Sequence, residues 1–173
     1  LTSTQINALT TTQEAGLTQT QLSALTSAQA SGFSSTQVSS LSATQLGAFT
    51  STQITGLTTS GLAGLTSTQI SALTTAQEAG FTSTQIGSLQ VVTQLAGLTS
   101  TQINALTTTQ EAGLTQTQLS ALTSAQASGF NSTQVGSLSA TQLGAFTSTQ
   151  ITGLTTSGLA GLTSTQISAL DRK

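Results

Sequence analysis

The sequence contains no cysteine, histidine, methionine, proline, tryptophan or tyrosine, and only 3% of its 173 residues are charged. The absence of cysteine excludes disulfides and thiolate metal sites. Without histidine or cysteine, no ordinary base is present to activate the many serine and threonine hydroxyls as nucleophiles. We therefore predict that the protein is not an enzyme and that it holds no metal and no cofactor.

Basic residues are also scarce, since Arg172 and Lys173 are the only two and the net charge is −2. Nucleic-acid binding relies on clustered lysine and arginine, so we expect no nucleic-acid partner. No apolar run approaches the roughly 18 to 20 residues of a membrane span, so we expect no membrane insertion. Leu1 opens directly on a repeat without a signal peptide, and we expect the chain to be a fragment or a processed piece of a longer protein.

What the sequence does contain is one unit repeated every eight residues, here called the octad. The first octads read LTSTQINA, LTTTQEAG and LTQTQLSA, with leucine or phenylalanine at position one and usually an apolar residue at position six. In one continuous α-helix, eight residues leave an offset of about 80° per octad, so the leucines would circle the helix. In one straight strand, positions one and six would face opposite sides. A strand that bends within each octad stays open as an alternative, which would give a β-solenoid.

The octad matches a helix-start motif. Serine or threonine at position two and glutamine at position five form a capping box, and positions one and six then form the hydrophobic staple that accompanies it. The pattern predicts an all-α solenoid of very short capped helices, one per eight-residue repeat. The predicted capping pairs of the first three octads are Thr2 with Gln5, Thr10 with Gln13 and Thr18 with Gln21, and the predicted staple pairs are Leu1 with Ile6 and Leu17 with Leu22.

Helices of this length are not stable alone, so the octads must stack on one another. Residues 98–170 repeat residues 1–73 with two differences. The chain therefore divides into a first long module, residues 1–97, with eleven octads plus the nonapeptide 89–97, and a second, incomplete copy, residues 98–173. We expect both to form one continuous solenoid.

Some residues depart from the pattern. Gly61 and Gly158 stand where glutamine is expected, which indicates a turn or a close contact between segments. Val91 and Val92 lie in the nonapeptide, where we expect a local kink or a looser turn. Asp171 is a predicted helix N-cap after the last complete octad.

Three of the four acidic residues, Glu14, Glu78 and Glu111, occupy position six of their octads. In the first turn of a helix the dipole favours a carboxylate. We interpret them as solvated carboxylates rather than as calcium ligands or catalytic acids, because a calcium site needs several converging oxygens.

Tandem Leu-Thr-x-x-Gln-[Ile/Leu]-x-Ala units resemble those of very long, repetitive bacterial cell-surface or secreted proteins of adhesin or filament type. The resemblance covers essentially the whole chain and implies a structural role at the cell surface or outside the cell. The terminal octads carry no polar caps, so we expect head-to-tail self-association into an extracellular filament or an adhesin stalk. The alternatives are a surface-binding module for glycans or ice, using the threonine, glutamine and serine arrays, and an engineered consensus repeat.

Overall fold

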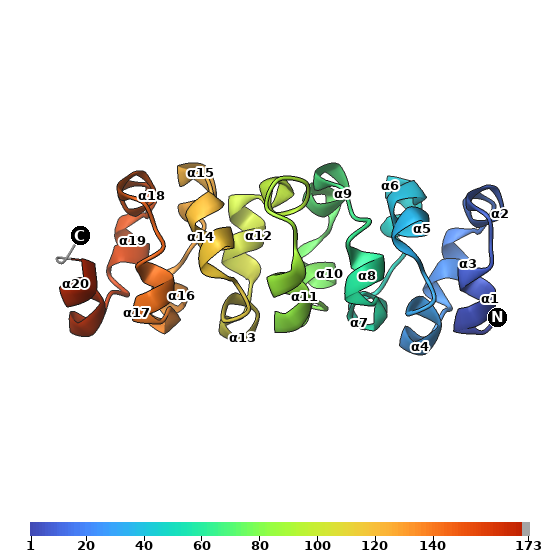
Figure 1. Ribbon diagram of the computed structural model, residues 1–173, viewed down its shortest axis with the longest axis horizontal. Helices are drawn as coiled ribbons and strands as arrows, with labels where there is room; N and C mark the ends of the chain where they lie inside the picture. The colour runs from blue at the N-terminus through green and yellow to red at the C-terminus, as the bar shows by residue number, and fades with distance from the viewer. Residues whose placement is uncertain (171–173) are drawn as a thin grey trace.

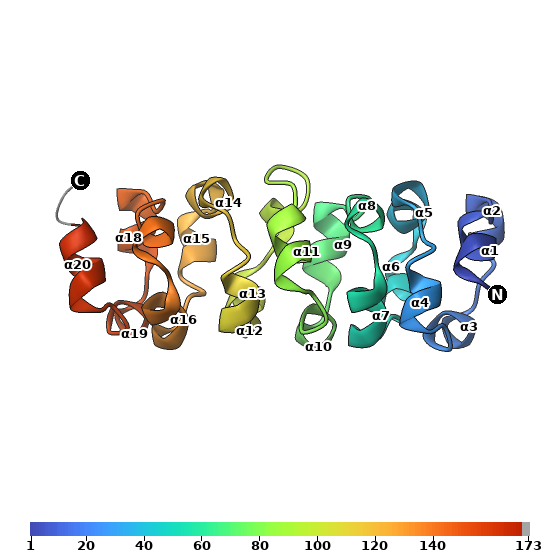
Figure 2. The same ribbon diagram turned by 60° about the horizontal axis from the view of Figure 1, so that its bottom comes forward.

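The structure, a computed structural model, describes residues 1–170 and has the shape of a rod (Figure 1). The chain winds around the long axis of the rod as a superhelix of short helices, and its two ends lie at opposite ends of the rod (Figure 2). The described residues contain helices and no strands, which confirms the predicted all-α solenoid and shows that the β-solenoid alternative is wrong. The predicted N-cap Asp171 lies outside the described residues.

Each octad forms one helix, which begins at position three because the residue at position two caps it. The N-cap residue has an extended backbone, and its side chain accepts a hydrogen bond from the backbone N–H at position five, as Thr99 does from Gln102. The helices of the first superhelical turn have five residues each: α1 (Ser3–Asn7), α2 (Thr11–Ala15) and α3 (Gln19–Ser23).

Beyond the first turn, helices of six and four residues alternate along the chain. The longer ones are α5 (Ser35–Ser40), α7 (Ser51–Gly56), α9 (Ser67–Ala72), α11 (Ser83–Ser88), α12 (Ser100–Ala105), α14 (Gln116–Ala121), α16 (Ser132–Ser137) and α18 (Ser148–Gly153). The shorter ones are α4 (Ser27–Ala30), α6 (Ala43–Leu46), α8 (Thr59–Leu62), α10 (Thr75–Glu78), α13 (Thr108–Glu111), α15 (Ser124–Ala127), α17 (Ala140–Leu143) and α19 (Thr156–Leu159). The chain then forms α20 (Ser164–Leu170).

Because of this alternation, the structural unit is a pair of helices and is two octads long. The eight-residue period of the sequence did not predict this longer unit. A sequence signal for it exists. All five phenylalanines, at position one, directly precede helices of six residues, whereas the three glutamates at position six lie only in the alternate octads. The two kinds of octad therefore differ in both sequence and helix length.

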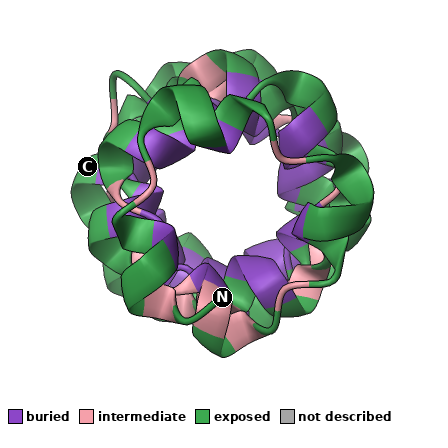
Figure 3. Ribbon diagram, turned by 90° about the vertical axis from the view of Figure 1, so that its right-hand side faces the viewer, coloured by how far each residue is buried: buried purple, intermediate pink, exposed green. Residues whose placement is uncertain are grey.

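Each helix packs against the helix of the third octad further along, as α1 does against α4 and α4 against α7. The helices consequently form a ring when the rod is viewed along its axis, and the buried residues face inward (Figure 3). Side chains from positions one and six fill this interior as one apolar cluster, which includes Leu41, Leu46 and Ile54. The core thus runs along the axis of the rod and is shared by all turns.

The nonapeptide inserts its extra residue as a turn at residues 91–94, followed by the 3₁₀-helix η1 (Leu95–Gly97). The loop protrudes from the rod, and the side chain of Val92 is 81% exposed. The expected looser turn is present. The stacking continues across it, because η1 packs against α9 and α12 packs against α10. None of the helices in residues 1–170 is long and apolar enough to cross a bilayer.

Candidate functional site: the glutamine ladder

Glutamine at position five connects each turn of the superhelix to the turn before it. In Gln110, Oε1 accepts the backbone N–H of Thr107 at 2.9 Å, which completes the capping box. Its Nε2 donates to the backbone carbonyls of Glu78 and Phe81, both at 2.8 Å, in the preceding turn. We call this repeated contact the glutamine ladder. Its members are Gln37, Gln45, Gln53, Gln69, Gln77, Gln85, Gln94, Gln102, Gln110, Gln118, Gln126, Gln134, Gln142, Gln150 and Gln166.

Each ladder amide has hydrogen-bond partners for both its oxygen and its nitrogen. Oε1 accepts one N–H and Nε2 donates both hydrogens, so a group that would be costly to bury is fully satisfied. Gln94 and Gln102 are accordingly 0% and 3% exposed. The carbonyl at position one, such as that of Phe81, accepts its hydrogen bond from the ladder glutamine. We call the pair of hydrogen bonds from one ladder glutamine to the preceding turn a rung. Each hydrogen bond of a rung contributes about 1 kcal/mol to stability, and the loss of a rung would leave buried carbonyls unpaired.

The predicted capping pairs of the first turn lie in reciprocal hydrogen bonds. Gln5 Oε1 accepts the Thr2 N–H at 2.8 Å, and Thr2 Oγ1 accepts the Gln5 N–H at 3.2 Å. In this turn, however, the glutamines are exposed, and their Nε2 atoms have no acceptor within residues 1–170. The same arrangement holds for Thr10 with Gln13 and for Thr18 with Gln21.

The predicted staple residues of the first turn differ in how far their side chains are buried. Ile6 and Leu22 at position six are fully buried, whereas Leu17 is half-buried and Leu1 is 60% exposed. Leu1, Ile6 and Leu17 line one hollow at the open end of the rod together with Leu25. In the interior turns, where another turn covers them, the position-one residues are buried.

Gly61 and Gly158 interrupt the ladder and replace it with direct contact between helices. A Cβ atom at Gly61 would lie 2.5 Å from the Phe33 carbonyl oxygen, and one at Gly158 would lie 2.7 Å from that of Phe130. These are the carbonyls that a ladder glutamine would otherwise bind. Of the two readings, a turn or a close contact, the structure shows the close contact. The threonine caps persist, since Thr58 Oγ1 accepts the Gly61 N–H at 3.0 Å.

Glycine at position eight sets the spacing between turns elsewhere. A Cβ atom at Gly113 would lie 2.1 Å from the Ser83 carbonyl oxygen, a distance that no side chain can adopt. The backbones of α11 and the α13 octad therefore touch there, which only glycine allows.

The three glutamates are buried, so the expectation that they are solvated is wrong. Glu14, Glu78 and Glu111 are 1%, 2% and 1% exposed. Position six of every octad faces the axis of the rod, so a carboxylate placed there enters the core although the first turn of a helix is electrostatically favourable. Burial raises the pKa of each carboxyl from its ordinary value of 4.5, to about 7 for Glu14 and Glu111 and to about 8 for Glu78.

Two of these carboxyls have a hydrogen-bond partner, which lowers the pKa against the larger effect of burial. Ser40 Oγ donates to Glu14 Oε2 at 3.2 Å, and Ser137 Oγ donates to Glu111 Oε2 at 3.0 Å. Both carboxyl oxygens of Glu78 are buried without a partner within residues 1–170. The sequence signal for this burial was available, because position six is apolar in most octads.

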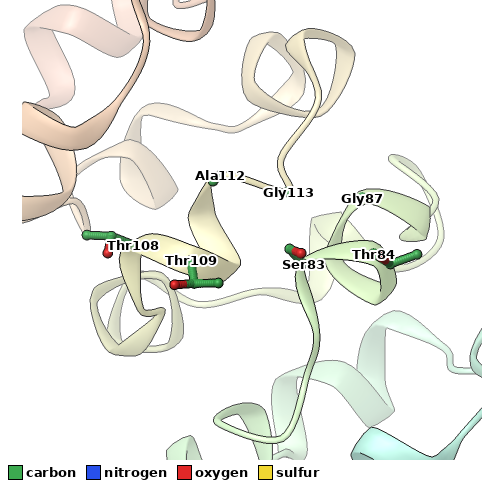
Figure 4. A pocket seen from close by; sticks show the side chains of 7 residues that line it. All are labelled: Ser83, Thr84, Gly87, Thr108, Thr109, Ala112 and Gly113. Atoms are coloured by element: carbon green, nitrogen blue, oxygen red, sulfur yellow. The ribbon is translucent and has the colours of Figure 1, made fainter.

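Outside the ladder, the surface carries open hollows between successive turns. One lies between α11 and α13, and Figure 4 shows its lining: Ser83, Thr84, Gly87, Thr108, Thr109, Ala112 and Gly113. Similar hollows lie between α1 and α4, between α7 and α10, and between α12 and α15. Their hydroxyls could hydrogen-bond a polar ligand. Residues 1–170 contain no group of three or more histidine, cysteine, aspartate or glutamate residues placed to bind a metal.

No protein-family model, no curated protein and no solved structure matches this chain.

Proposed function

We propose that the chain is a structural repeat protein and not an enzyme, which forms an extracellular filament or the stalk of a surface adhesin by stacking and self-association. The glutamine ladder is the observation that carries this proposal. It binds every turn to the next with the same pair of hydrogen bonds, so the fold extends in one dimension without a change of chemistry. A rod of this kind supplies length and spacing.

The two ends of the rod are complementary in their hydrogen-bonding groups, since one end has free amide donors and the other has carbonyl acceptors. In the first turn, Gln13 and Gln21 present amide N–H groups without acceptors within residues 1–170, and Gln21 lines the same hollow as the exposed side chain of Leu1. In the last turn, the carbonyls of Ile151 and Leu154 have no ladder glutamine, and the side chain of Ile167 is 54% exposed. A ladder glutamine binds carbonyls 31 and 28 residues earlier, as Gln150 does.

If Leu170 leaves the end of α20 and Leu1 of a second copy takes its place in the octad count, Gln13 of that copy takes the place that donates to Ile151 and Leu154. Its Gln21 takes the place that donates to Leu159 and Leu162. Both contacts repeat the geometry of the interior rungs. The apolar side chains of the two end turns then meet in the interior of the rod. The contact is head-to-tail and does not close on itself, so it produces a filament.

Electron microscopy and light scattering of the purified 173-residue chain test this proposal. We expect fibres of uniform width whose length increases with protein concentration. The double variant Gln13→Glu and Gln21→Glu keeps the side-chain oxygens that complete the capping boxes but removes the amide donors, so it should fold and remain monomeric. The matched control Gln116→Glu, an exposed position outside the ladder, should still form fibres. Monomeric wild-type protein at high concentration would contradict the proposal.

A second candidate function, a surface-binding module for glycans or ice, is supported by the hydroxyl-lined hollows. In the hollow between α11 and α13, the hydroxyls of Ser83, Thr84 and Thr109 have no hydrogen-bond partner within residues 1–170, which leaves them available to sugar hydroxyls or to ordered water. Thermal hysteresis and a glycan array test it directly. Binding that is lost in Thr84→Ala with Thr109→Ala, in monodisperse protein, would favour this function over the filament.

A further inference from the structure

Three carboxyl groups lie inside an apolar core that offers them no positive charge. Glu14 is on α2, which packs against α5, Glu78 is on α10, which packs against α7 and α12, and Glu111 is on α13, which packs against α11 and α16. None of these packed helices carries an ionisable side chain, and residues 1–170 contain no lysine, arginine or histidine. No side chain of the described residues can therefore neutralise an ionised glutamate, and their one other positive group is the α-amino group of Leu1, a residue that is 60% exposed at the end of the rod.

The same glutamates are also acceptors in the glutamine ladder. The backbone carbonyl of Glu14 accepts from Gln45 Nε2 at 2.9 Å, that of Glu78 from Gln110 at 2.8 Å and that of Glu111 from Gln142 at 3.4 Å. A displacement of the glutamate toward water would move its carbonyl and break that rung. The charge state of the carboxyl is thus linked to the contact between turns.

Hydrogen bonding to the carboxyls differs among the three sites. The serine partner lies 26 residues after the glutamate in the pairs Glu14 with Ser40 and Glu111 with Ser137. For Glu78 the equivalent position falls one residue later, because the nonapeptide 89–97 intervenes, and it is Ala105 on α12. The central glutamate therefore lacks the hydroxyl that the other two have, and both its oxygens are unpaired.

We propose that the three glutamates make this solenoid a proton-dependent structure, closed when the carboxyls are protonated and loosened at their rungs when they ionise. Glu78 is the most sensitive of the three because it has no hydroxyl partner. The raised pKa values agree with this assignment, since folding then takes up protons. The proposal concerns the single rod and does not depend on filament formation.

The direction of the effect follows from linkage. Each pKa is raised on folding from 4.5 to about 7 or 8, so the stabilisation is fully present below pH 4.5 and is lost as the pH rises toward 8. Most globular proteins lose stability in acid, whereas this chain should gain it. We expect the equilibrium constant for unfolding to rise at least about tenfold per glutamate between pH 5 and pH 9.

Thermal and urea unfolding followed by circular dichroism between pH 5 and pH 9 test the proposal. The wild-type midpoint should fall steadily with pH, and the triple variant Glu14→Leu, Glu78→Leu and Glu111→Leu should have a nearly constant midpoint. Leucine occupies the same position at Leu62 and Leu119, so the variant is expected to fold. A constant wild-type midpoint, or an unchanged slope in the triple variant, would overturn the proposal.

A second measurement keeps the test independent of the triple variant. In carbon-13 NMR titrations of the folded wild type, the side-chain carboxyl of Glu78 should titrate near pH 8, and those of Glu14 and Glu111 near pH 7. The variant Ala105→Ser should lower the midpoint of Glu78 toward the other two. Titration of all three carboxyls near pH 4.5 in the folded protein would also overturn the proposal.

Discussion

Residues 1–24 and 98–121 have the same sequence and the same capped helix starts but different surroundings. In the first segment the helices α1, α2 and α3 each have five residues, whereas in the second α12, α13 and α14 have six, four and six. Gln13 is exposed, and its counterpart Gln110 is 4% exposed and holds two carbonyls of the turn below. The capping boxes are the same in both. The second segment packs on a preceding turn and the first does not, so the burial of the glutamine depends on that turn and not on the octad itself.

We expect the largest difference in stability between alanine substitutions at Gly113 and at Gly16, its counterpart in the first segment. Gly113→Ala should destabilise the protein by about 3 kcal/mol, because the new Cβ would lie 2.1 Å from the Ser83 carbonyl oxygen. Gly16→Ala should be neutral or stabilising by up to about 1 kcal/mol, since its nearest neighbour is the Gln13 oxygen of its own helix at 3.3 Å. Urea unfolding of both variants gives the difference. Equal midpoints would mean that the turns do not touch at Gly113.

The next largest difference in stability is expected between alanine substitutions at Gln110 and at Gln13. Gln110→Ala removes two hydrogen bonds to the preceding turn as well as the capping contact, and should cost about 2 to 4 kcal/mol. Gln13→Ala removes only the capping contact and should cost about 0.5 to 1 kcal/mol. Amide hydrogen exchange would show the loss of protection in α10 and α13 for the first variant. Equal losses of stability would reduce the ladder to a local capping motif.

A smaller change in stability is expected at the serine–glutamate pair that occurs once in each copy of the module, Ser40 with Glu14 and Ser137 with Glu111. Ser137→Ala and Ser40→Ala each remove a hydroxyl that favours the ionised carboxyl, so the pKa of Glu111 or Glu14 should rise further. Each variant should therefore cost about 1 kcal/mol at pH 9 and less at pH 5. Ser120→Ala, an exposed serine that bonds only its own helix, is the control. A cost that does not change with pH would exclude the pairing.

The smallest effect tests the nonapeptide that separates the two copies. Deleting Val92, which is 81% exposed, should change the stability by less than about 1 kcal/mol, because the loop protrudes and the ladder already resumes at Gln94. Deleting Thr84 within an octad should instead disrupt packing, because every later core position of that octad moves to another face. Melting temperatures of the two deletion variants compare them. A large loss on deleting Val92 would show that the loop supports the stack.

Much of the local structure could be predicted from the octad. Threonine or serine at position two with glutamine at position five specified where each helix begins, since the capping bonds join atoms only three residues apart. The apolar residues at positions one and six specified the core face. The two-octad period was missed, although the placement of the phenylalanines and glutamates encodes it. The second role of glutamine could not be predicted, because its carbonyl acceptors lie 28 to 32 residues away.

The sequence by itself determined short capped helices, their starting points and an inward apolar face, because these depend on contacts within one octad. The tertiary structure alone decided that every third octad packs together, that the glutamine amide binds the turn before it, and that glycine is required where backbones meet. It also decided that the glutamates lie in the core without counter-charges. These features depend on the pitch of the superhelix, which arises from the packing of whole turns and not from any single repeat.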